Sequence, residues 1–132
     1  GQISFPGGSV DKTDDSLASA AIRETFEEVG ILPQDIEILG QLSSYPTPAG
    51  FRIYPFVGYV KKYSQNISHC EVNRIITVPL RHLMDYKNME IKNFSRGKSE
   101  YPMPFFYYEQ NTIWGATGLI LKEFLDEIKN LI

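Results

Sequence analysis

Three closely spaced glutamates are the side chains of this sequence best suited to chemistry. Glu27 and Glu28 follow Glu24 by three and four positions, which makes all three neighbours on one face of an α-helix. Like charges at this spacing repel by roughly 0.2–0.5 kcal/mol per pair. The single positive charge of Arg23 cannot offset three negative charges. Hard divalent cations such as Mg²⁺ or Mn²⁺ prefer carboxylate oxygens. The pattern therefore indicates either a divalent-metal site or a solvated acidic helix face.

The loop before this helix favours the metal site. Gly7 and Gly8 follow Gln2–Phe5, for which we expect a short strand that ends at Pro6. Because glycine has no side chain, the backbone at these two positions can approach a ligand closely. A phosphate-sized space beside the carboxylates is the arrangement that this order of elements predicts.

The helix that carries the glutamates has recognisable ends. We expect its N-cap at Asp14, Asp15 or Ser16 and its C-terminus at Gly30. Asp11, Asp14 and Asp15 serve either as further metal ligands or as turn and cap residues, and we favour the second role. Apolar residues with helical spacing form a stripe that we expect to face a core: Ala18, Ala21, Ile22, Phe26 and Val29.

This stretch resembles the signature of the Nudix hydrolases, G-x5-E-x7-R-E-U-x-E-E-x-G-U, where U is a bulky apolar residue. Gly8 and the segment Arg23–Ile31, RETFEEVGI, carry the resemblance, with the arginine, three glutamates and final glycine intact. Three positions depart from the signature. Asp15 stands for its first glutamate, Thr25 for its first apolar residue, and the loop after Gly8 is one residue longer.

One subgroup, the coenzyme A diphosphatases, is similar in more than the signature. A GQxxFPGG segment precedes the signature in that subgroup, and six residues here match it: Gly1, Gln2, Phe5, Pro6, Gly7 and Gly8. Two later stretches are also similar to it, FRIYPFVGY at residues 51–59 and IWGAT at residues 113–117. The longer loop is a further point of similarity.

The resemblance implies an α/β fold, namely the Nudix-type α/β/α sandwich with a mixed β-sheet. We expect a single domain over residues 1–132. Because the sequence begins at the GQxxFPGG segment, we also expect the usual N-terminal strand to be missing and the domain to be N-terminally truncated. The implied reaction is metal-dependent hydrolysis of a nucleoside diphosphate linked to another moiety, with Mg²⁺ or Mn²⁺ as cofactor.

Catalytic roles follow from the resemblance residue by residue. Glu24, Glu27 and Glu28 are the expected metal ligands, and Arg23 would hold the carboxylates in position through charge-assisted hydrogen bonds. The general base stays open between Glu27, Glu28 and Glu109. For Glu109, at the end of an expected strand, we favour an ordinary surface role.

Gly7, Gly8 and Arg52 are the expected substrate-binding residues. The backbone at Gly8 would supply a further oxygen ligand. Arg52, on an expected strand, either meets a phosphate or is a solvent-facing residue, and the sequence favours neither.

The remaining chain alternates strands and helices. Hydrophobic patterning predicts strands at Ile36–Tyr45, Phe51–Lys61, Glu71–Val78, Met89–Ser95 and Tyr101–Glu109, and helices at Pro79–Leu83 and Ala116–Ile128. The aromatic run Phe105–Tyr108 could stack an adenine ring, but alternation along a strand leads us to expect two of its rings in the core. For the isolated His69 and His82 we expect surface or structural roles.

Three functions compete. The first is a coenzyme A diphosphatase, which yields adenosine 3′,5′-bisphosphate and (acyl-)4′-phosphopantetheine. The second is a Nudix hydrolase of another substrate, such as ADP-ribose or a dinucleotide. The third is a non-catalytic Nudix domain that binds a nucleotide or a protein. The intact glutamates argue against the third function, and the GQxxFPGG segment argues against the second.

Composition limits the partners. The formal net charge of −3 argues against a nucleic-acid partner, and no apolar run is long enough to span a membrane. The single cysteine, Cys70, cannot form an intrachain disulfide, which agrees with an intracellular location in the cytosol, mitochondrion or peroxisome. We expect a small nucleotide as substrate, and the sequence leaves a homodimer open.

Overall fold

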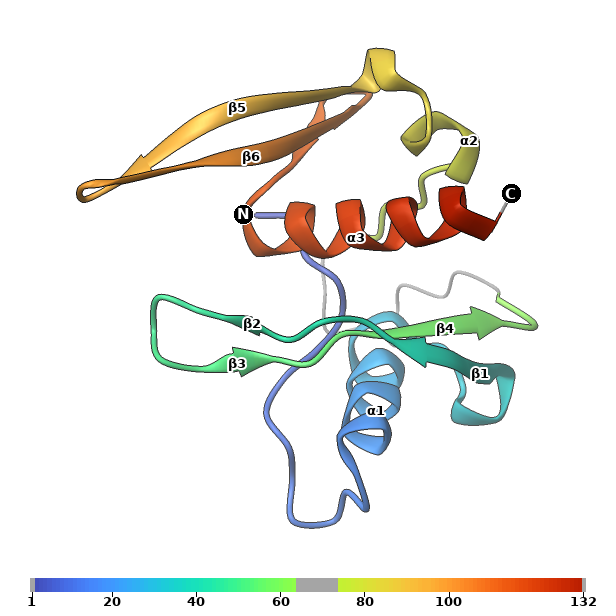
Figure 1. Cartoon of the computed structure of the whole chain (residues 1–132). Coiled ribbons are helices and arrows are strands. Elements are labelled where there is room, and N and C mark those ends of the chain that lie inside the picture. Colours follow the sequence, from blue (N-terminus) through green and yellow to red (C-terminus); the bar gives the residue numbers. More distant parts are fainter. Residues whose placement is uncertain (1, 64–73, 132) are drawn as a thin grey trace. The chain divides into compact units, whose positions relative to one another are not determined.

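The chain divides into two compact units. The computed structural model describes residues 2–63 and 74–131. We call Phe5–Ile76 the N-terminal unit; the first four residues together with Thr77–Ile132 form the C-terminal unit. Both units combine helices with antiparallel strands (Figure 1), so the expected α/β class is confirmed.

Helix α1, Leu17–Val29, carries the three glutamates and has the predicted ends. The Ser16 side chain caps it by accepting a hydrogen bond from the backbone N–H three positions later, at 3.1 Å. Gly30 ends the helix at φ 77°, a left-handed conformation that glycine adopts without strain. The predicted apolar stripe is only partly right, because Ala20 is the buried residue of α1 and Phe26 is 44% exposed.

The strands of the N-terminal unit form one long antiparallel hairpin (Figure 1). After α1 and the short 3-10 helix η1 (Pro33–Asp35), the hairpin is formed by four strands: β1 (Ile36–Gln41), β2 (Tyr45–Pro46), β3 (Arg52–Ile53) and β4 (Phe56–Val60). Strand β1 pairs with β4, and β2 pairs with β3. Between these pairs, the Leu42 N–H donates to the Pro55 carbonyl at 3.0 Å. Each of the two predicted strands is therefore present but divided in two.

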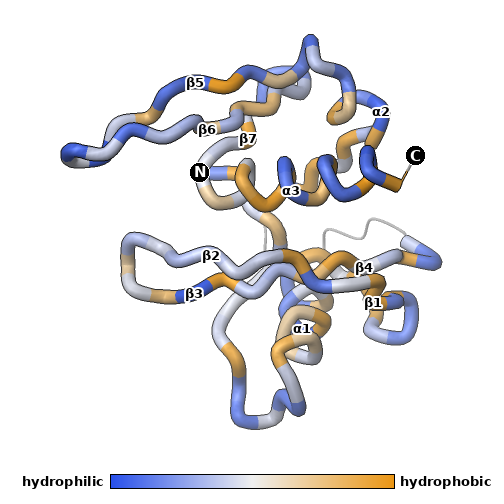
Figure 2. The backbone as a smooth tube through the Cα atoms, viewed as in Figure 1, coloured by the Kyte–Doolittle hydropathy of each residue, from blue (hydrophilic) through white to orange (hydrophobic). Residues whose placement is uncertain are grey.

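The C-terminal unit holds a three-stranded antiparallel sheet in the order β5-β6-β7. Its elements are α2 (Leu80–Leu83), the 3-10 helix η3 (Tyr86–Asn88), β5 (Met89–Arg96), β6 (Ser99–Tyr108), β7 (Asn111–Ile113) and α3 (Gly115–Leu131). The predicted helices are confirmed, and the two strands predicted at residues 89–95 and 101–109 pair as the β5–β6 hairpin. Figure 2 shows hydrophilic residues at the tip of this hairpin, as its turn requires.

Helix α3 closes the core of the C-terminal unit against β6 and β7. The buried core cluster consists of Phe106, Ile113, Leu121 and Leu125. Hydrophobic and hydrophilic residues alternate along α3 in Figure 2, because its apolar positions recur with the helical period. Phe106 and Leu125 are each 2% exposed.

Three sequence predictions need correction or qualification. Residues 2–5 are not in a strand; instead, the Ile3 side chain packs against the core of the C-terminal unit. The predicted strand 71–78 begins outside the described residues, and residues 74–78 are not in a strand. His69 and Cys70 also lie outside the described residues. Strand β7 was not predicted, because three residues are too few for a periodic pattern.

Candidate active site

Arg23 lies at the centre of the site, and all five of its N–H groups are engaged. Nε donates to Oδ1 of Asp14 at 3.0 Å, and Nη2 donates to Oδ2 of Asp14 and to the Ser9 carbonyl, each at 3.0 Å. Nη1 donates to Oε1 of Glu24 at 2.9 Å and to Oε2 of Glu27 at 3.1 Å. One guanidinium thus connects the loop before α1 to two of the three glutamates.

Asp14 is the most enclosed carboxylate around this guanidinium. Its side chain is 5% exposed, compared with 16% for Glu24 and 40% for Glu27. The Asp11 backbone N–H donates to Oδ2 of Asp14 at 2.7 Å. Hydrogen bonds from Arg23 and then from Asp11 lower the pKa of Asp14, and the same Asp14 contact is the main reason that the pKa of Arg23 is raised. The two groups therefore form a charge-assisted, bidentate pair.

The glycine loop lies directly against the other carboxylates. A Cβ atom at Gly8 would lie 2.6 Å from Cδ of Glu24 and 2.7 Å from its Oε1, so only glycine leaves this side chain in place. A Cβ atom at Gly7 would meet nothing within 4 Å, but the Gly7 backbone N–H donates to Oε2 of Glu28 at 2.9 Å. The loop therefore contacts one glutamate sterically and another through a hydrogen bond.

The donor set suits a hard divalent cation in chemistry and charge. Asp14, Glu24 and Glu27 share the single guanidinium of Arg23, so three negative charges against one positive charge leave two negative charges. The candidate side-chain ligands are all carboxylates, whose oxygens Mg²⁺ and Mn²⁺ prefer. Yet within residues 2–63 and 74–131 no three metal-ligating side chains gather into a group that could hold an ion. Arg23 and the Gly7 N–H set the present orientations, so a cation has to compete with these hydrogen bonds.

The described contacts of Arg52 and the position of Glu109 involve residues other than those around Arg23. Nε of the exposed Arg52 donates to Oγ of Ser44 at 2.8 Å, within the β2–β3 hairpin. Glu109 is exposed in the turn between β6 and β7 and has φ 54°. The described contacts bring Gly7, Gly8 and the helix glutamates together, and they do not include Arg52 or Glu109.

Sequence reasoning did not predict the contacts of Arg23 with Asp14, which it considered only as a metal ligand or as a turn or cap residue, or with the Ser9 carbonyl. The signature points to Asp15 as its first acidic residue, but Asp15 is exposed and Asp14 contacts Arg23. The extra residue in the loop makes the two aspartates indistinguishable by counting. Ser9 contributes a backbone carbonyl, which no side-chain pattern reveals.

Aromatic residues and His82 have packing roles in the C-terminal unit. Phe106 is buried in the core, whereas Phe105 stacks on Trp114 with ring centres 5.7 Å apart and an interplanar angle of 9°. The His82 ring contacts Tyr108 edge-on at 4.9 Å, and its Nε2 lies 2.7 Å from the Tyr107 carbonyl. These contacts agree with the predicted structural role of His82.

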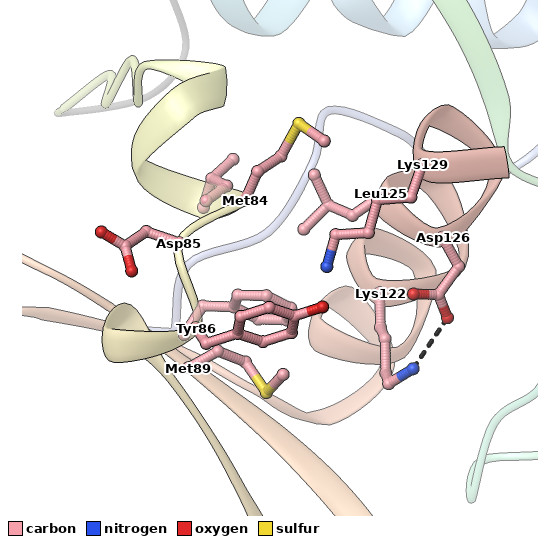
Figure 3. Close-up of a pocket in the computed structure, with 10 residues that line it drawn as sticks. Met84, Asp85, Tyr86, Met89, Lys122, Leu125, Asp126 and Lys129 are labelled. Carbon is pink, nitrogen blue, oxygen red and sulfur yellow. Dashed lines mark hydrogen bonds and ion pairs between the residues drawn. The ribbon is translucent and has the colours of Figure 1, made fainter. Parts of the chain in front are cut away.

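A cavity of about 150 Å³ lies in the C-terminal unit between α2, η3, β5, β6 and α3 (Figure 3). Apolar side chains such as Met84, Met89 and Leu125 line much of it. Both lysines at the cavity are engaged. Lys122 forms an ion pair with Asp126 at 2.7 Å, and Nζ of Lys129 lies 4.6 Å from the centre of the Tyr86 ring. Of the charged residues at this cavity, Lys122 is thus paired within α3, whereas Lys129 contacts an aromatic ring.

Comparison with known proteins agrees with this geometry. A family model described as the NUDIX domain matches residues 1–98. The chain belongs to the Nudix family. Enzymes of this family act on small nucleotide substrates and typically need divalent ions such as Mg²⁺ or Mn²⁺. The predicted α/β Nudix fold is confirmed at the level of the family.

Bacterial relatives extend the similarity beyond the matched domain. The chain is 32% identical over 130 residues to "Uncharacterized Nudix hydrolase NudL" of Photorhabdus laumondii, covering 98% of this chain and 70% of that protein. It is 36% identical over 124 residues to proteins of the same name from Salmonella paratyphi B and Salmonella newport, covering 93% of this chain and 65% of theirs. The chain therefore spans about two thirds of the length of these relatives.

Within residues 2–63 and 74–131, no helix combines the length and the apolar character that crossing a bilayer requires.

Proposed function

We propose that this protein hydrolyses the diphosphate bridge of coenzyme A or its acyl derivatives in the presence of Mg²⁺ or Mn²⁺. The observation that carries the proposal is the cluster around Arg23. In this cluster Glu24, Glu27 and Asp14 all pair with the guanidinium group of Arg23, and Glu24 lies against Gly8 of the glycine loop. The GQxxFPGG segment and the longer loop support coenzyme A over other diphosphates. The expected products are adenosine 3′,5′-bisphosphate and (acyl-)4′-phosphopantetheine.

The reaction adds one water across the P–O–P bridge. The water oxygen forms a bond to one phosphorus, and the bridging P–O bond breaks with its electron pair going to the other phosphate. The proton of the attacking water passes to a carboxylate, for which Glu27 and Glu28 are our candidates: both lie on α1, where Glu28 accepts the Gly7 N–H and Glu27 accepts from Arg23. Glu109 stays a third candidate.

The residues of α1 would hold the cation while the loop receives the diphosphate. Glu24, Glu27 and Glu28 are the proposed ligands, and Arg23 holds the first two of them through Nη1. A bound divalent cation supplies charge neutralisation for the diphosphate and lowers the pKa of the attacking water. The Gly7–Gly8 backbone keeps the approach to the carboxylates open, since neither residue carries a side chain there.

A panel assay tests the proposal. Purified protein with Mg²⁺ or Mn²⁺ is given coenzyme A, ADP-ribose and a dinucleoside polyphosphate, and the products are separated by chromatography. We expect coenzyme A to be split fastest and EDTA to abolish turnover. Comparable rates on all three substrates would remove the coenzyme A assignment and leave a general Nudix hydrolase. Binding of the nucleotides without turnover would favour a non-catalytic domain.

The oligomeric state of the purified protein is a separate question. Size-exclusion chromatography with light scattering decides between a monomer and the homodimer that the sequence leaves open.

We propose that Arg52 contacts a phosphate of the substrate, so Arg52→Gln should raise KM more than it lowers kcat. An unchanged KM would leave Arg52 as a residue of the β2–β3 hairpin that bonds to Ser44.

A further inference from the structure

The cavity of the C-terminal unit has an apolar floor. Phe106 and Leu125, each 2% exposed, belong to the core cluster, and Leu83, Met84 and Met89 pack against that cluster. Water finds few hydrogen-bond partners on such a floor, so an apolar group can displace it. The cavity volume is about 150 Å³, and an engineered apolar cavity of about this size binds benzene. Size and lining thus suit one small ring or a short hydrocarbon chain.

A cation without a carboxylate partner lies at the rim of this cavity. Nζ of Lys129, in the last turn of α3, lies 4.6 Å from the centre of the Tyr86 ring. Among the residues that the structure describes, no carboxylate lies within ion-pair distance of this ammonium group. Tyr86 is 75% exposed, so this rim of the cavity is open to solvent. A ligand can therefore reach both the ammonium group and the apolar floor.

The other charged side chains at the cavity have different partners. Lys122 and Asp126 form an ion pair at 2.7 Å, so their charges offset each other. Oδ1 of Asp85 accepts the Lys87 backbone N–H at 3.0 Å, and Figure 3 shows the Asp85 carboxylate directed away from Lys129. The positive charge available to a ligand in the cavity is that of Lys129.

We propose that this cavity binds a small carboxylate with an apolar body, either an aromatic acid or a short-chain acid. The apolar body fills the cavity, and the carboxylate accepts a charge-assisted hydrogen bond from Nζ of Lys129 at the rim. The lining residues include none of the α1 glutamates. The inference therefore goes beyond the proposed function and does not depend on it.

The three methionines of the chain report binding directly. Met84 and Met89 line the cavity, whereas Met103 is buried elsewhere in the same unit and serves as an internal control. Full-length protein labelled with ¹³C at the methionine methyl groups is titrated with benzoate or hexanoate and followed by NMR, with signals assigned from Met→Leu variants. We expect at least one of the two acids to shift the Met84 and Met89 signals saturably, and the Met103 signal to stay in place. The acid that binds more tightly shows whether the cavity prefers a flat ring or a flexible chain. Acetate, which lacks an apolar body, should cause no saturable shift.

The charge is tested with the acid that binds more tightly. Its neutral alcohol, benzyl alcohol or hexanol, keeps the apolar body and should bind about 10-fold more weakly, because a hydrogen bond to a charged group is stronger than one between neutral groups. Lys129→Gln should weaken binding of the acid about 10-fold and leave the affinity for the alcohol unchanged. Lys87→Gln is the matched control, since the exposed Lys87 lies on η3 but does not line the cavity. For this control we expect a change of at most about twofold.

The possible failures are distinguishable. Absence of saturable shifts at Met84 and Met89 with both acids, or equal shifts at Met103, overturns the binding site. Equal affinities for the acid and its alcohol, or unchanged affinity for the acid in a folded Lys129→Gln protein, overturn the assignment of a carboxylate. If Lys129→Gln does not fold, as judged by circular dichroism, the comparison of acid with alcohol on the wild type carries the test. The panel assay of diphosphate substrates contains none of these acids, so its result is independent of this titration.

Discussion

The two units of the chain differ in what they bury. In the part of the chain that the structure describes, the buried apolar side chains other than Ala20 and Pro55 belong to the C-terminal unit, around Phe106 and Leu125. The N-terminal unit instead encloses a charged pair, Asp14 with Arg23, at 5% and 24% side-chain exposure. One unit is organised by packing and the other by ionic hydrogen bonds.

This difference predicts where mutations should lower stability and where they should lower metal binding or catalytic activity. Removing a buried apolar side chain leaves a cavity that the surrounding core fills only partly, so the free energy of unfolding falls. Removing a carboxylate from the Arg23 cluster changes the charge and the hydrogen bonding without opening a hydrophobic cavity. We therefore expect stability effects to dominate in the C-terminal unit and functional effects in the N-terminal unit.

The largest expected effect is on stability, in the C-terminal unit. Phe106→Ala should lower the free energy of unfolding by about 3–5 kcal/mol, because it removes a fully buried aromatic ring from the core. Urea denaturation followed by circular dichroism measures this change. Leu131→Ala is the control, since Leu131 is 85% exposed, and it should stay within about 0.5 kcal/mol. Equal losses in both variants would contradict the location of the core.

Next comes a functional effect in the N-terminal unit. Glu28→Gln should reduce turnover of coenzyme A by about 100-fold or more while leaving the melting temperature nearly unchanged. The amide keeps an oxygen that can accept the Gly7 N–H but removes the charge. Glu37→Gln, on the exposed side of β1, is the matched control and should keep full activity. Unchanged turnover in Glu28→Gln would refute its assignment as a ligand.

The two loop glycines offer a finer comparison. Gly8→Ala should weaken Mn²⁺ binding by about 10-fold or more, because its Cβ atom would displace the Glu24 carboxylate. The fold should survive, since the clashing atoms are the end of a flexible side chain. In Gly7→Ala the added Cβ atom meets nothing within 4 Å, so Mn²⁺ affinity should hardly change. Calorimetric titration with Mn²⁺ measures the affinity of both variants. Equal Mn²⁺ affinities in Gly8→Ala and Gly7→Ala would show that Glu24 is not held against Gly8.

The smallest expected effect is a pH dependence. The folded pKa of Asp14 lies below the usual 3.8, chiefly because Arg23 donates hydrogen bonds to it. A lowered pKa means that this contact stabilises the folded state above pH 3.8 and that the stabilisation is lost as the pH falls through the folded value. The stability difference between the wild type and Asp14→Asn should therefore shrink in acid, as urea titrations at several pH values would measure. A difference that stays constant below pH 3.8 would contradict the ionic contact.

Local signals predicted most of the fold. Helix α1 ends where its cap residues Ser16 and Gly30 stand, since both act within one helical turn. The apolar repeat of α3 and the turn of the β5–β6 hairpin are likewise local features. Residues 2–5 were wrongly predicted as a strand, because a strand needs a pairing partner that its own sequence does not specify.

The sequence by itself determined the family of this protein and the face of α1 on which Glu27 lies beside Arg23 and Glu24, because helical periodicity brings residues three and four positions apart together. Tertiary structure decided that Asp14, rather than Asp15, holds the arginine, and that Gly8 touches Glu24 while Gly7 bonds to Glu28. Those contacts join a loop to a helix 9 to 21 residues apart in sequence, and only the folded path of the backbone fixes them.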